Sequence, residues 1–469
     1  MVRVLLRRRP TRCCCGAGLR RALATQPPQQ RDGEAKGSGG VGSGAGAASA
    51  AEPEREHEAA AGGLRSLLSA LDPLTRRQLG VLAAGTGIVS LGFGMVVPVL
   101  PQFAAQWGEF GATGVGLVVA APAVAKLALN RAAGRRADSH GRVPLMAAGA
   151  ATSAVGNFAC AAASSIGGVC GARLAVGAGS AAGGAATQAY LADVTAKFPQ
   201  HRGAIMGTLG SIGMMSYGFG PAAGGLLAGQ FGPSVSFGAV GVGSAICGLA
   251  YASLPETLPP RPAEGKGEGS AEADAEERTF GQLLSGNPRL QALLVMDSAV
   301  YVGWAVWLAV VPLHAAAVWD ATPATLGVMY SVMAIAGAIG APLGGVLSDR
   351  FGREATVVTG GSLCAVSTLL LPYATSMVTF GAYLVIWDFA EGVLGAALSA
   401  LAADVAEERE RAQIFALRSQ VESGIFLVAP VAVGLVADVF SLSTSLWLAS
   451  ATMGTGVVGF RMLFRNASR

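Results

Sequence analysis

Six ionisable side chains lie inside long apolar stretches of this sequence, where a charge is costly and usually serves a function. They are Lys126, Arg173, Asp388, Glu391, Arg418 and Glu422. Asp388 and Glu391 are three residues apart, so a helix would place them on one face. Two carboxylates this close in an apolar medium resist being charged together, which suits reversible carriage of a proton. The alternative is that one of them belongs to a static ion pair.

Other ionisable residues of these stretches have simpler explanations. Arg418 and Glu422 are four residues apart and can neutralise each other on one helix. Asp297 and His314 stand near the ends of apolar runs, so we expect them to reach the membrane surface or the solvent.

The chain carries no pattern typical of an enzyme or a metal site. HExxH, GxSxG and spaced Cys/His clusters are absent from the sequence. Cys160, Cys170, Cys247 and Cys364 lie in apolar runs, where we expect small buried hydrophobic side chains. We therefore expect no catalytic residue, no cofactor and no metal.

The composition is that of a membrane protein. Of 469 residues, 52% are hydrophobic and 13% are charged, whereas a soluble domain carries about 25% charged residues. From Leu79 onward, twelve apolar runs reach the roughly 20 residues that cross a bilayer. The 67 glycines suit the close approach of helices in lipid. The sequence predicts an all-α membrane protein with twelve transmembrane helices.

The loops between these runs alternate in charge. Loops after even-numbered runs carry Lys or Arg, as at Arg135, Arg136 and Lys197, whereas "QWGEFGAT", "GQFGPS" and "DVFSLSTS" carry neither. Because positive loops stay in the cytoplasm, both termini are expected on that side. The sequence has no basic patch with interleaved aromatic residues, so we do not expect nucleic-acid binding.

The sequence also repeats itself at an offset of about 211 residues. The paired anchors are Pro101 and Pro312, Asp138 and Asp349, Asp193 and Asp404, and, at an offset of 209, Arg202 and Arg411, and Pro221 and Pro430. Two tandem halves of six spans share one orientation, which is the architecture of rocking-switch transporters. We assign residues 73–256 and 290–464 to the two halves, 257–289 to a cytoplasmic linker and 465–469 to a tail.

Residues 1–72 are expected to be a transit peptide followed by a disordered linker. The first 31 residues contain eight Arg and no acid, which is typical of organelle targeting, with a mitochondrial address favoured over a plastid one. The alternative is a disordered basic tail in which Cys13, Cys14 and Cys15 are palmitoylated.

Two loops at equivalent positions of the repeat carry one pattern. They are Gly134-x-x-x-Asp138-x-x-Gly141-Arg142 and Gly345-x-x-x-Asp349-Arg350-x-Gly352-Arg353. Both match the signature loop of the major facilitator superfamily, which the chain resembles from about Thr75 to Phe464. Within it the chain resembles the drug:proton antiporter branch, which includes multidrug exporters and vesicular amine transporters. The first copy departs at Ser139, where the family usually has Arg or Lys.

Weaker motifs support this resemblance. Arg173-x-x-x-Gly177-x-Gly179 is similar to the family's Arg-containing motif, with Val176 where Gln is usual. A further stretch looks like the antiporter motif, with Ser216 where Gly is usual, through Gly207, Gly220, Pro221, Gly224 and Gly225. These glycines equally suit a kink at Pro221 and tight packing against the run around Ile335. "LPET", Leu254 to Thr257, is common in this branch.

The resemblance implies that the charged loops act as a gate. Asp138 would meet the positive N-terminus of the helix that begins near Arg411, and Asp349 would mirror it near Arg202. Such contacts would join the halves when the cavity opens outward and break when it opens inward. The alternative is that the charges only set the topology.

Four more residues complete the expected contacts. Arg142 would pair with Asp193, and Arg353 with Asp404. The family's arrangement of helices also allows Lys126 to pair with Glu422 across the interface.

Together these features predict a monomeric secondary transporter in an organelle membrane, which exchanges a small organic solute for protons by alternating access. One alternative is a facilitator or proton symporter of an organic anion, favoured by Lys126 and Arg173 if they face the cavity. A remote alternative is a membrane-embedded sensor without transport. The first apolar run has no acid, although several antiporters of the branch use one there for cations.

Overall fold

The computed structural model of the protein describes residues 72–107, 111–198, 201–258, 284, 286–405 and 411–467. The predicted transit peptide and most of the predicted linker between the halves lie outside the described residues. The elements are α2 (Pro73–Val96), α3 (Leu100–Ala105), α4 (Gly111–His140), α5 (Arg142–Ala162), α6 (Ile166–Ala196), α7 (Arg202–Phe231), α8 (Pro233–Ala252), α10 (Pro288–Ala309), α11 (Val311–Trp319), α12 (Pro323–Phe351), α13 (Arg353–Leu370), η2 (Leu371–Tyr373), α14 (Met377–Val405), α15 (Arg411–Val439) and α16 (Leu442–Asn466).

Nine spans in the described residues are long and apolar enough to cross a membrane, with α10 and α11 counted as one span. The twelve-span prediction also needs α6, α7 and α16, which have 31, 30 and 25 residues. Glycine in α6 and α7, and Ser, Thr and Gly in α16, make these three helices less hydrophobic. Small residues of this kind allow close helix contacts, so low hydropathy does not argue against a position inside the membrane.

Several helices begin at a capping side chain. Asp72, Ser165, Asn287, Thr322 and Ser441 each accept a hydrogen bond from the backbone N–H three residues on. Each cap satisfies a donor that the first helical turn leaves without a partner.

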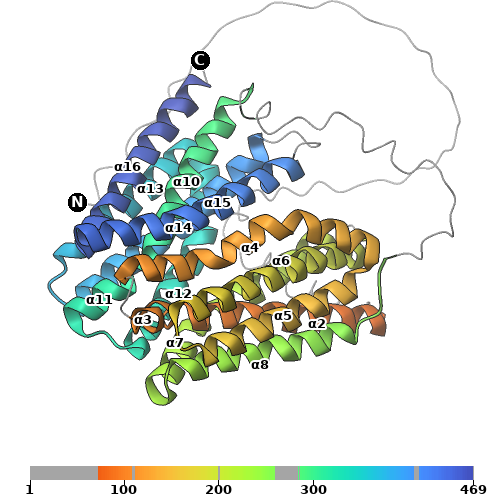
Figure 1. Ribbon diagram of the computed structural model, residues 1–469. Coiled ribbons are helices and arrows are strands. Elements are labelled where there is room, and N and C mark those ends of the chain that lie inside the picture. Colours follow the sequence, from red (N-terminus) through yellow and green to blue (C-terminus); the bar gives the residue numbers. More distant parts are fainter. Residues whose placement is uncertain are drawn as a thin grey trace, which may run out of the picture. The chain divides into compact units, whose positions relative to one another are not determined.

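The helices pack as two bundles within one compact unit, Gly63–Arg469. In the N-terminal bundle, α2 and α4 to α8 pack mainly on one another, and in the C-terminal bundle α10 to α16 do the same. Figure 1 shows the two groups of helices, and the main contacts between them are α4 with α15 and α7 with α12.

At the seam between α7 and α12 the two backbones lie against each other. A side chain at Gly225 would collide with the backbone of Pro323, and one at Gly327 with that of Pro221. Ala222 follows Pro221 inside α7, and its N–H donates to Ser331 Oγ across the seam at 3.0 Å.

The seam between α4 and α15 repeats this arrangement. A side chain at Gly434 would collide with the backbone of Ala112, and one at Gly116 with that of Pro430. The four residues are the repeat equivalents of those in the other seam. The internal repeat therefore has a structural meaning, since each half supplies one proline-kinked helix and one glycine-bearing partner.

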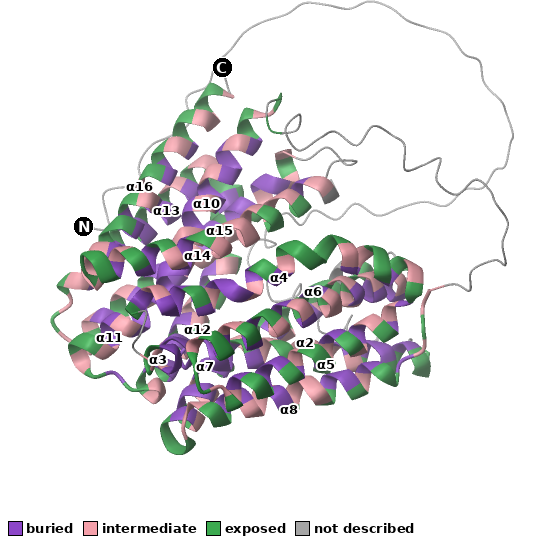
Figure 2. Cartoon of the chain, viewed as in Figure 1, coloured by how far each residue is buried: buried purple, intermediate pink, exposed green. Residues whose placement is uncertain are grey.

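Large apolar side chains cover the outer faces of the helices. Val155, Leu249 and Val378 are 66%, 76% and 81% exposed, and exposed residues line the outward helix surfaces in Figure 2. A surface of this kind is stable when lipid covers it.

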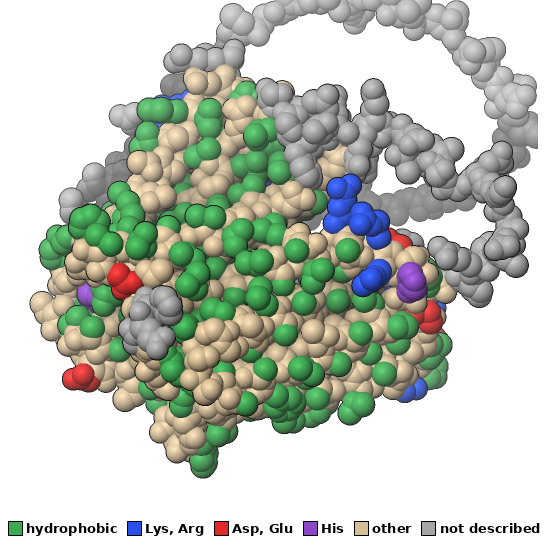
Figure 3. Space-filling view, in the orientation of Figure 1, with side chains coloured by type: hydrophobic (Ala, Val, Ile, Leu, Met, Phe, Trp, Pro, Cys, Tyr) green, Lys and Arg blue, Asp and Glu red, His purple; other side chains and the backbone are tan. Residues whose placement is uncertain are grey.

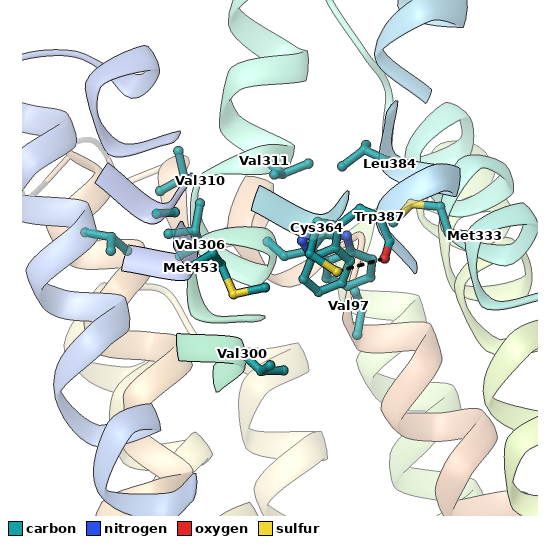
Figure 4. Packing of buried hydrophobic residues seen from close by; sticks show 14 of the residues in the cluster. Val97, Val300, Val306, Val310, Val311, Met333, Cys364, Leu384, Trp387 and Met453 are labelled. Atoms are coloured by element: carbon teal, nitrogen blue, oxygen red, sulfur yellow. Dashed lines mark hydrogen bonds between the residues drawn. The ribbon is translucent and has the colours of Figure 1, made fainter. Parts of the chain in front are cut away.

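An aromatic core holds the C-terminal bundle together. Trp307 lies 4.3 Å from Tyr330 between ring centroids and stacks with Trp387 at 6.3 Å. Cys364 is fully buried, and its Sγ donates to the Trp387 carbonyl at 3.6 Å (Figure 4). Of the four cysteines expected to be buried, only Cys170 is partly exposed.

Glu256 ties the end of α8 to the start of α5. Its carboxylate accepts the backbone N–H of Arg142 at 2.9 Å and of Val143 at 3.0 Å, and also those of Thr257 and Leu258 at 3.0 Å. Partial burial acts to raise the pKa of Glu256, but the four N–H donors outweigh it and lower this pKa below the ordinary 4.5. The carboxylate therefore serves as the N-cap that Gly141, which has no side chain, cannot supply.

We expect Glu256→Gln to lower the free energy of unfolding by about 1 kcal/mol at neutral pH, as for a lost helix cap. Because the pKa of Glu256 is lowered by folding, its contribution is complete above pH 4.5 and is lost as the pH falls through the lowered value. Melting of the purified protein at several pH values measures this. Glu354→Gln, which removes a surface pair with Arg465, should change little. If the difference in melting temperature between Glu256→Gln and the unmodified protein does not become smaller in acid, Glu256 does not act as this helix cap.

Candidate functional site

The two signature loops form matching ion pairs. Arg142 contacts Asp193 at 3.1 Å and Asp138 at 2.8 Å. Arg353 contacts Asp404 at 2.8 Å and also bonds Asp349. The turn glycines Gly141 and Gly352 have φ of +108° and +91°, which residues with a side chain rarely adopt. Figure 3 shows Lys and Arg side chains gathered at one end of the N-terminal bundle.

The acids of these loops stay within their own bundles. Asp138 bonds Arg142 and Asp349 bonds Arg353, and no hydrogen bond joins either acid to α15 or α7 among the described residues. The start of α15 adjoins residues 406–410 and the start of α7 adjoins residues 199–200, which lie outside the described residues, so the expected contacts with those helices stay predictions. Gly134 and Gly345 face open space, and Arg350 lies over the ring of Phe351 at 5.6 Å.

The hydrogen bonds that do join the bundles lie toward the opposite helix ends or within the seams. Gln102 Nε2 donates to the Ala321 carbonyl at 2.8 Å. Asp438 of α15 accepts the N–H of Ala112 at 2.7 Å and the N–H and hydroxyl of Thr113 at 2.8 and 2.6 Å. We call these three bonds the Asp438 latch. The hydrogen bonds that join the described parts of the bundles thus lie away from the charged loops.

A cavity of about 340 Å³ lies between the bundles. Lys126 of α4 and Arg173 of α6 line it from one side, and Tyr301, Trp304 and Glu422 line it from the other. Most of the remaining wall is apolar, with Phe93, Val97, Pro122, Leu308 and Phe426. Its size and mixed lining are those of a site for one small organic molecule.

Two cations face this cavity without a protein anion bound to them. Arg173 is 8% exposed, its Nε has no hydrogen-bond partner, and no ion pair to it occurs among the described residues. Lys126 forms no ion pair in that part of the chain either, although its charge interacts with Glu422. Lys126 and Glu422, which we expected to pair, therefore line the same cavity but form no ion pair among the described residues. A buried guanidinium without a partner calls for an anion from outside the chain.

A second cavity, of about 400 Å³, holds the predicted pair of carboxylates. Asp388 and Glu391 of α14 both line it, and Asp388 is 6% exposed. Trp304 Nε1 donates to Glu391 Oε1 at 3.4 Å. Trp304 also lines the central cavity, so this indole stands between the carboxylates and the two cations.

Arg418 has a different partner from the predicted one. It forms a double hydrogen bond with Asp297 of α10, at 2.6 and 2.9 Å, rather than an ion pair with Glu422. Asp297 is 3% exposed, so the expectation that it reaches the surface was wrong, because a cation on a neighbouring helix neutralises it. His314 is also buried, and its ring stacks on Phe380 at 5.7 Å.

The glycines of the antiporter-like stretch serve helix contacts. Gly220 and Gly224 face the backbone of α2, and Gly225 faces α12 in the seam described above with Pro221. Gly207 faces open space. Four of the five positions are thus explained by packing.

The fold holds cavities between and within two bundles whose helices include spans long and apolar enough to cross a membrane. The model of the Major Facilitator Superfamily matches residues 82–313 and 293–469, and the chain belongs to this superfamily. This confirms the predicted all-α fold of two six-helix halves, and the protein is a transporter rather than an enzyme.

Solved structures share this fold. A bacterial homologue of the human lysosomal transporter Spinster, inward-facing and unoccupied, has a TM-score of 0.67, 16% identity and coverage of 84% of this chain and 96% of its own. The human organic anion transporter MFSD10 has a TM-score of 0.59 and 17% identity, with coverage of 83% of this chain and 100% of its own. The nucleoside transporter NupG has a TM-score of 0.65 and 13% identity, with coverage of 84% of this chain and 100% of its own. At such identities the likeness shows the fold alone.

One curated relative is similar over a short segment. The gentisate transporter of Corynebacterium glutamicum is 36% identical over 87 residues. The match spans 19% of this chain and only 20% of the length of that relative.

We expect Asp438→Ala to favour opening of the helix ends that the Asp438 latch holds. Losing charge-assisted hydrogen bonds of about 1.5–3 kcal/mol should shift the conformational equilibrium at least about tenfold. Labelling of a cysteine introduced at Val97, in the cavity wall, by an impermeant maleimide applied from the latch side measures the shift. Gln230→Ala, an exposed change at the end of α7, is the control. Equal labelling in both variants would show that the latch does not hold this side closed.

Proposed function

We propose that the protein transports a small organic anion together with protons by alternating access. The observation that carries this proposal is the pair of cations, Arg173 and Lys126, that face the central cavity without a protein anion bound to them. A carboxylate entering the cavity would supply the missing partner, and Arg173 offers it the fork geometry of a guanidinium.

The carboxylates support the proton coupling. Asp388 and Glu391 lie in the C-terminal bundle, whereas Arg173 and Lys126 lie in the N-terminal bundle. Because the two sites are distinct, an anion and a proton can be bound at the same time. A proton on Glu391 also removes a negative charge from the vicinity of the cavity that Trp304 borders, and this favours the anion. Positive coupling of this kind produces symport rather than exchange.

The short sequence match supports an anionic solute, because it is to a gentisate transporter. The absence of an acid in the first apolar run, α2, further disfavours an organic cation.

Exchange of a solute for protons is the second candidate. The antiporter-like stretch in α7 and "LPET" after α8 favour it and would place the chain in the drug:proton antiporter branch. Because the seams account for most of those glycines, the motif adds less weight than the cations do.

In this proposal the halves, residues 73–256 and 290–464, rock about the cavity, and residues 257–289 link them. The loop pairs of Arg142 and Arg353 act as the gate, and the protein works as a monomer. If positive loops are cytoplasmic, the present conformation opens inward. The Arg-rich N-terminal segment supports an organelle membrane, the mitochondrial one first.

Arg173→Gln should lower the rate of uptake of labelled benzoate into proteoliposomes at least about tenfold, as for a lost bond to a charged group. Arg173→Lys should retain part of the activity because the charge remains. Arg131→Gln, an exposed change on α4 outside the cavity lining, is the matched control. Uptake that survives in Arg173→Gln while the control behaves normally would exclude this guanidinium as the anion's partner.

Glu391→Gln should abolish accumulation of benzoate driven by an acidic exterior but retain exchange of labelled for unlabelled benzoate. The reason is that exchange needs no net proton movement, whereas accumulation does. Glu354→Gln, at the surface, should retain both. Accumulation driven by an acidic interior in the unmodified protein would instead establish exchange for protons.

A further inference from the structure

A side pocket of about 320 Å³ extends from the central cavity into the N-terminal bundle. The two spaces share Lys126, Arg173 and Pro122 in their walls. Beyond these residues the side pocket is lined by apolar side chains such as Val89, Met146 and Val240, by glycines, and by polar groups, which include Ser90, Ser153, Asn157, Ser180, Thr187 and Gln188.

Asn157 lines this pocket and has an unused hydrogen-bond acceptor. The side chain is 3% exposed, and its Nδ2 donates to the Ser153 carbonyl at 2.8 Å. That bond sets the orientation of the amide, because a flipped amide would place two oxygens together. Oδ1 is left without a partner among the described residues, which is unfavourable for a buried acceptor.

Arg173 lines the same pocket and has an unused donor. Its Nε lacks a partner, like Asn157 Oδ1. The two residues follow directly after a close contact between α5 and α6, since a side chain at Gly156 would meet the carbonyl oxygen of Ala172 at 2.9 Å. A cationic donor and a neutral acceptor are thus held on adjoining, closely packed helices.

A matching solute carries an anionic group and a hydrogen-bond donor at separate positions. We propose that the Asn157 side pocket is a specificity subsite for a hydroxyl group of the solute, so that the protein selects hydroxylated carboxylic acids. This inference rests on the proposed function, since Arg173 and Lys126 hold the carboxylate. A site that uses a hydroxyl discriminates strongly against the analogue that lacks it, because its own polar atom then stays buried without a partner.

The test compares 3-hydroxybenzoate with benzoate, which differ only in the hydroxyl. Dissociation constants for the full chain in detergent and uptake into proteoliposomes are measured for both. We expect the unmodified protein to bind the hydroxylated acid at least about tenfold more tightly. In Asn157→Leu, which keeps a similar volume, the ratio of the two affinities should fall to about one. Thr152→Ala, an exposed change on the same helix, should retain the preference.

A second variant tests the pairing of the two residues. Asn157→Asp would place a carboxylate beside Arg173, so binding of both acids should fall at least about tenfold through competition. The elution profile in gel filtration shows whether each variant is folded. If Asn157→Leu fails to fold and Asn157→Asp folds, the binding of the two acids to Asn157→Asp decides between the outcomes. Undiminished binding of both acids to that variant overturns the subsite.

The outcomes separate the subsite from the proposed function. Equal affinity for both acids in the unmodified protein, or an unchanged ratio in Asn157→Leu, overturns the subsite while transport of benzoate upholds the proposed function. Preferential binding that depends on Asn157 without uptake of either acid upholds the subsite and overturns the transport proposal. Binding of neither acid overturns both.

Discussion

The two glycine seams are the constraint on which the rest of the structure depends. At each one a proline-kinked helix of one half lies backbone to backbone with a helix of the other half, with Gly225 against Pro323 and Gly434 against Ala112. Contacts this close require small residues. Both seams lie away from the charged loops, and the central cavity lies between the bundles.

Within that frame, the distribution of charge is uneven between the bundles. The C-terminal bundle neutralises its own Arg418 with Asp297, whereas the N-terminal bundle leaves Arg173 buried without an anion. An unneutralised cation in an apolar interior is unfavourable by itself. The anionic solute of the proposed function would relieve this cost.

Much of this arrangement was predictable from the sequence. The family resemblance of the signature loops implied the pairs of Arg142 with Asp193 and of Arg353 with Asp404, and both contacts are present. What remained out of reach were partners from distant segments. Spacing of four residues suggested Glu422 for Arg418, but only tertiary structure brings Asp297 nearer. Asp438 and Asn157 lacked any local pattern, since each acts through backbone or solute groups that no spacing rule encodes. The "LPET" motif contains Glu256 but gave no sign that this residue caps α5.

The Asp438 latch makes the two seams unequal. At the position in the first half that corresponds to Asp438, the chain has Gly229, which only contacts Ala324. Water can compete for the bonds of a carboxylate at a helix end, whereas it has no comparable access to the apolar contacts of the α7–α12 seam. Separation at the latched ends would therefore begin along α4 and α15, with the α7–α12 seam as the hinge line. Lys126 and Glu422 belong to those two helices. A solute that enters between α4 and α15 would therefore meet the charged residues of the cavity at its entrance.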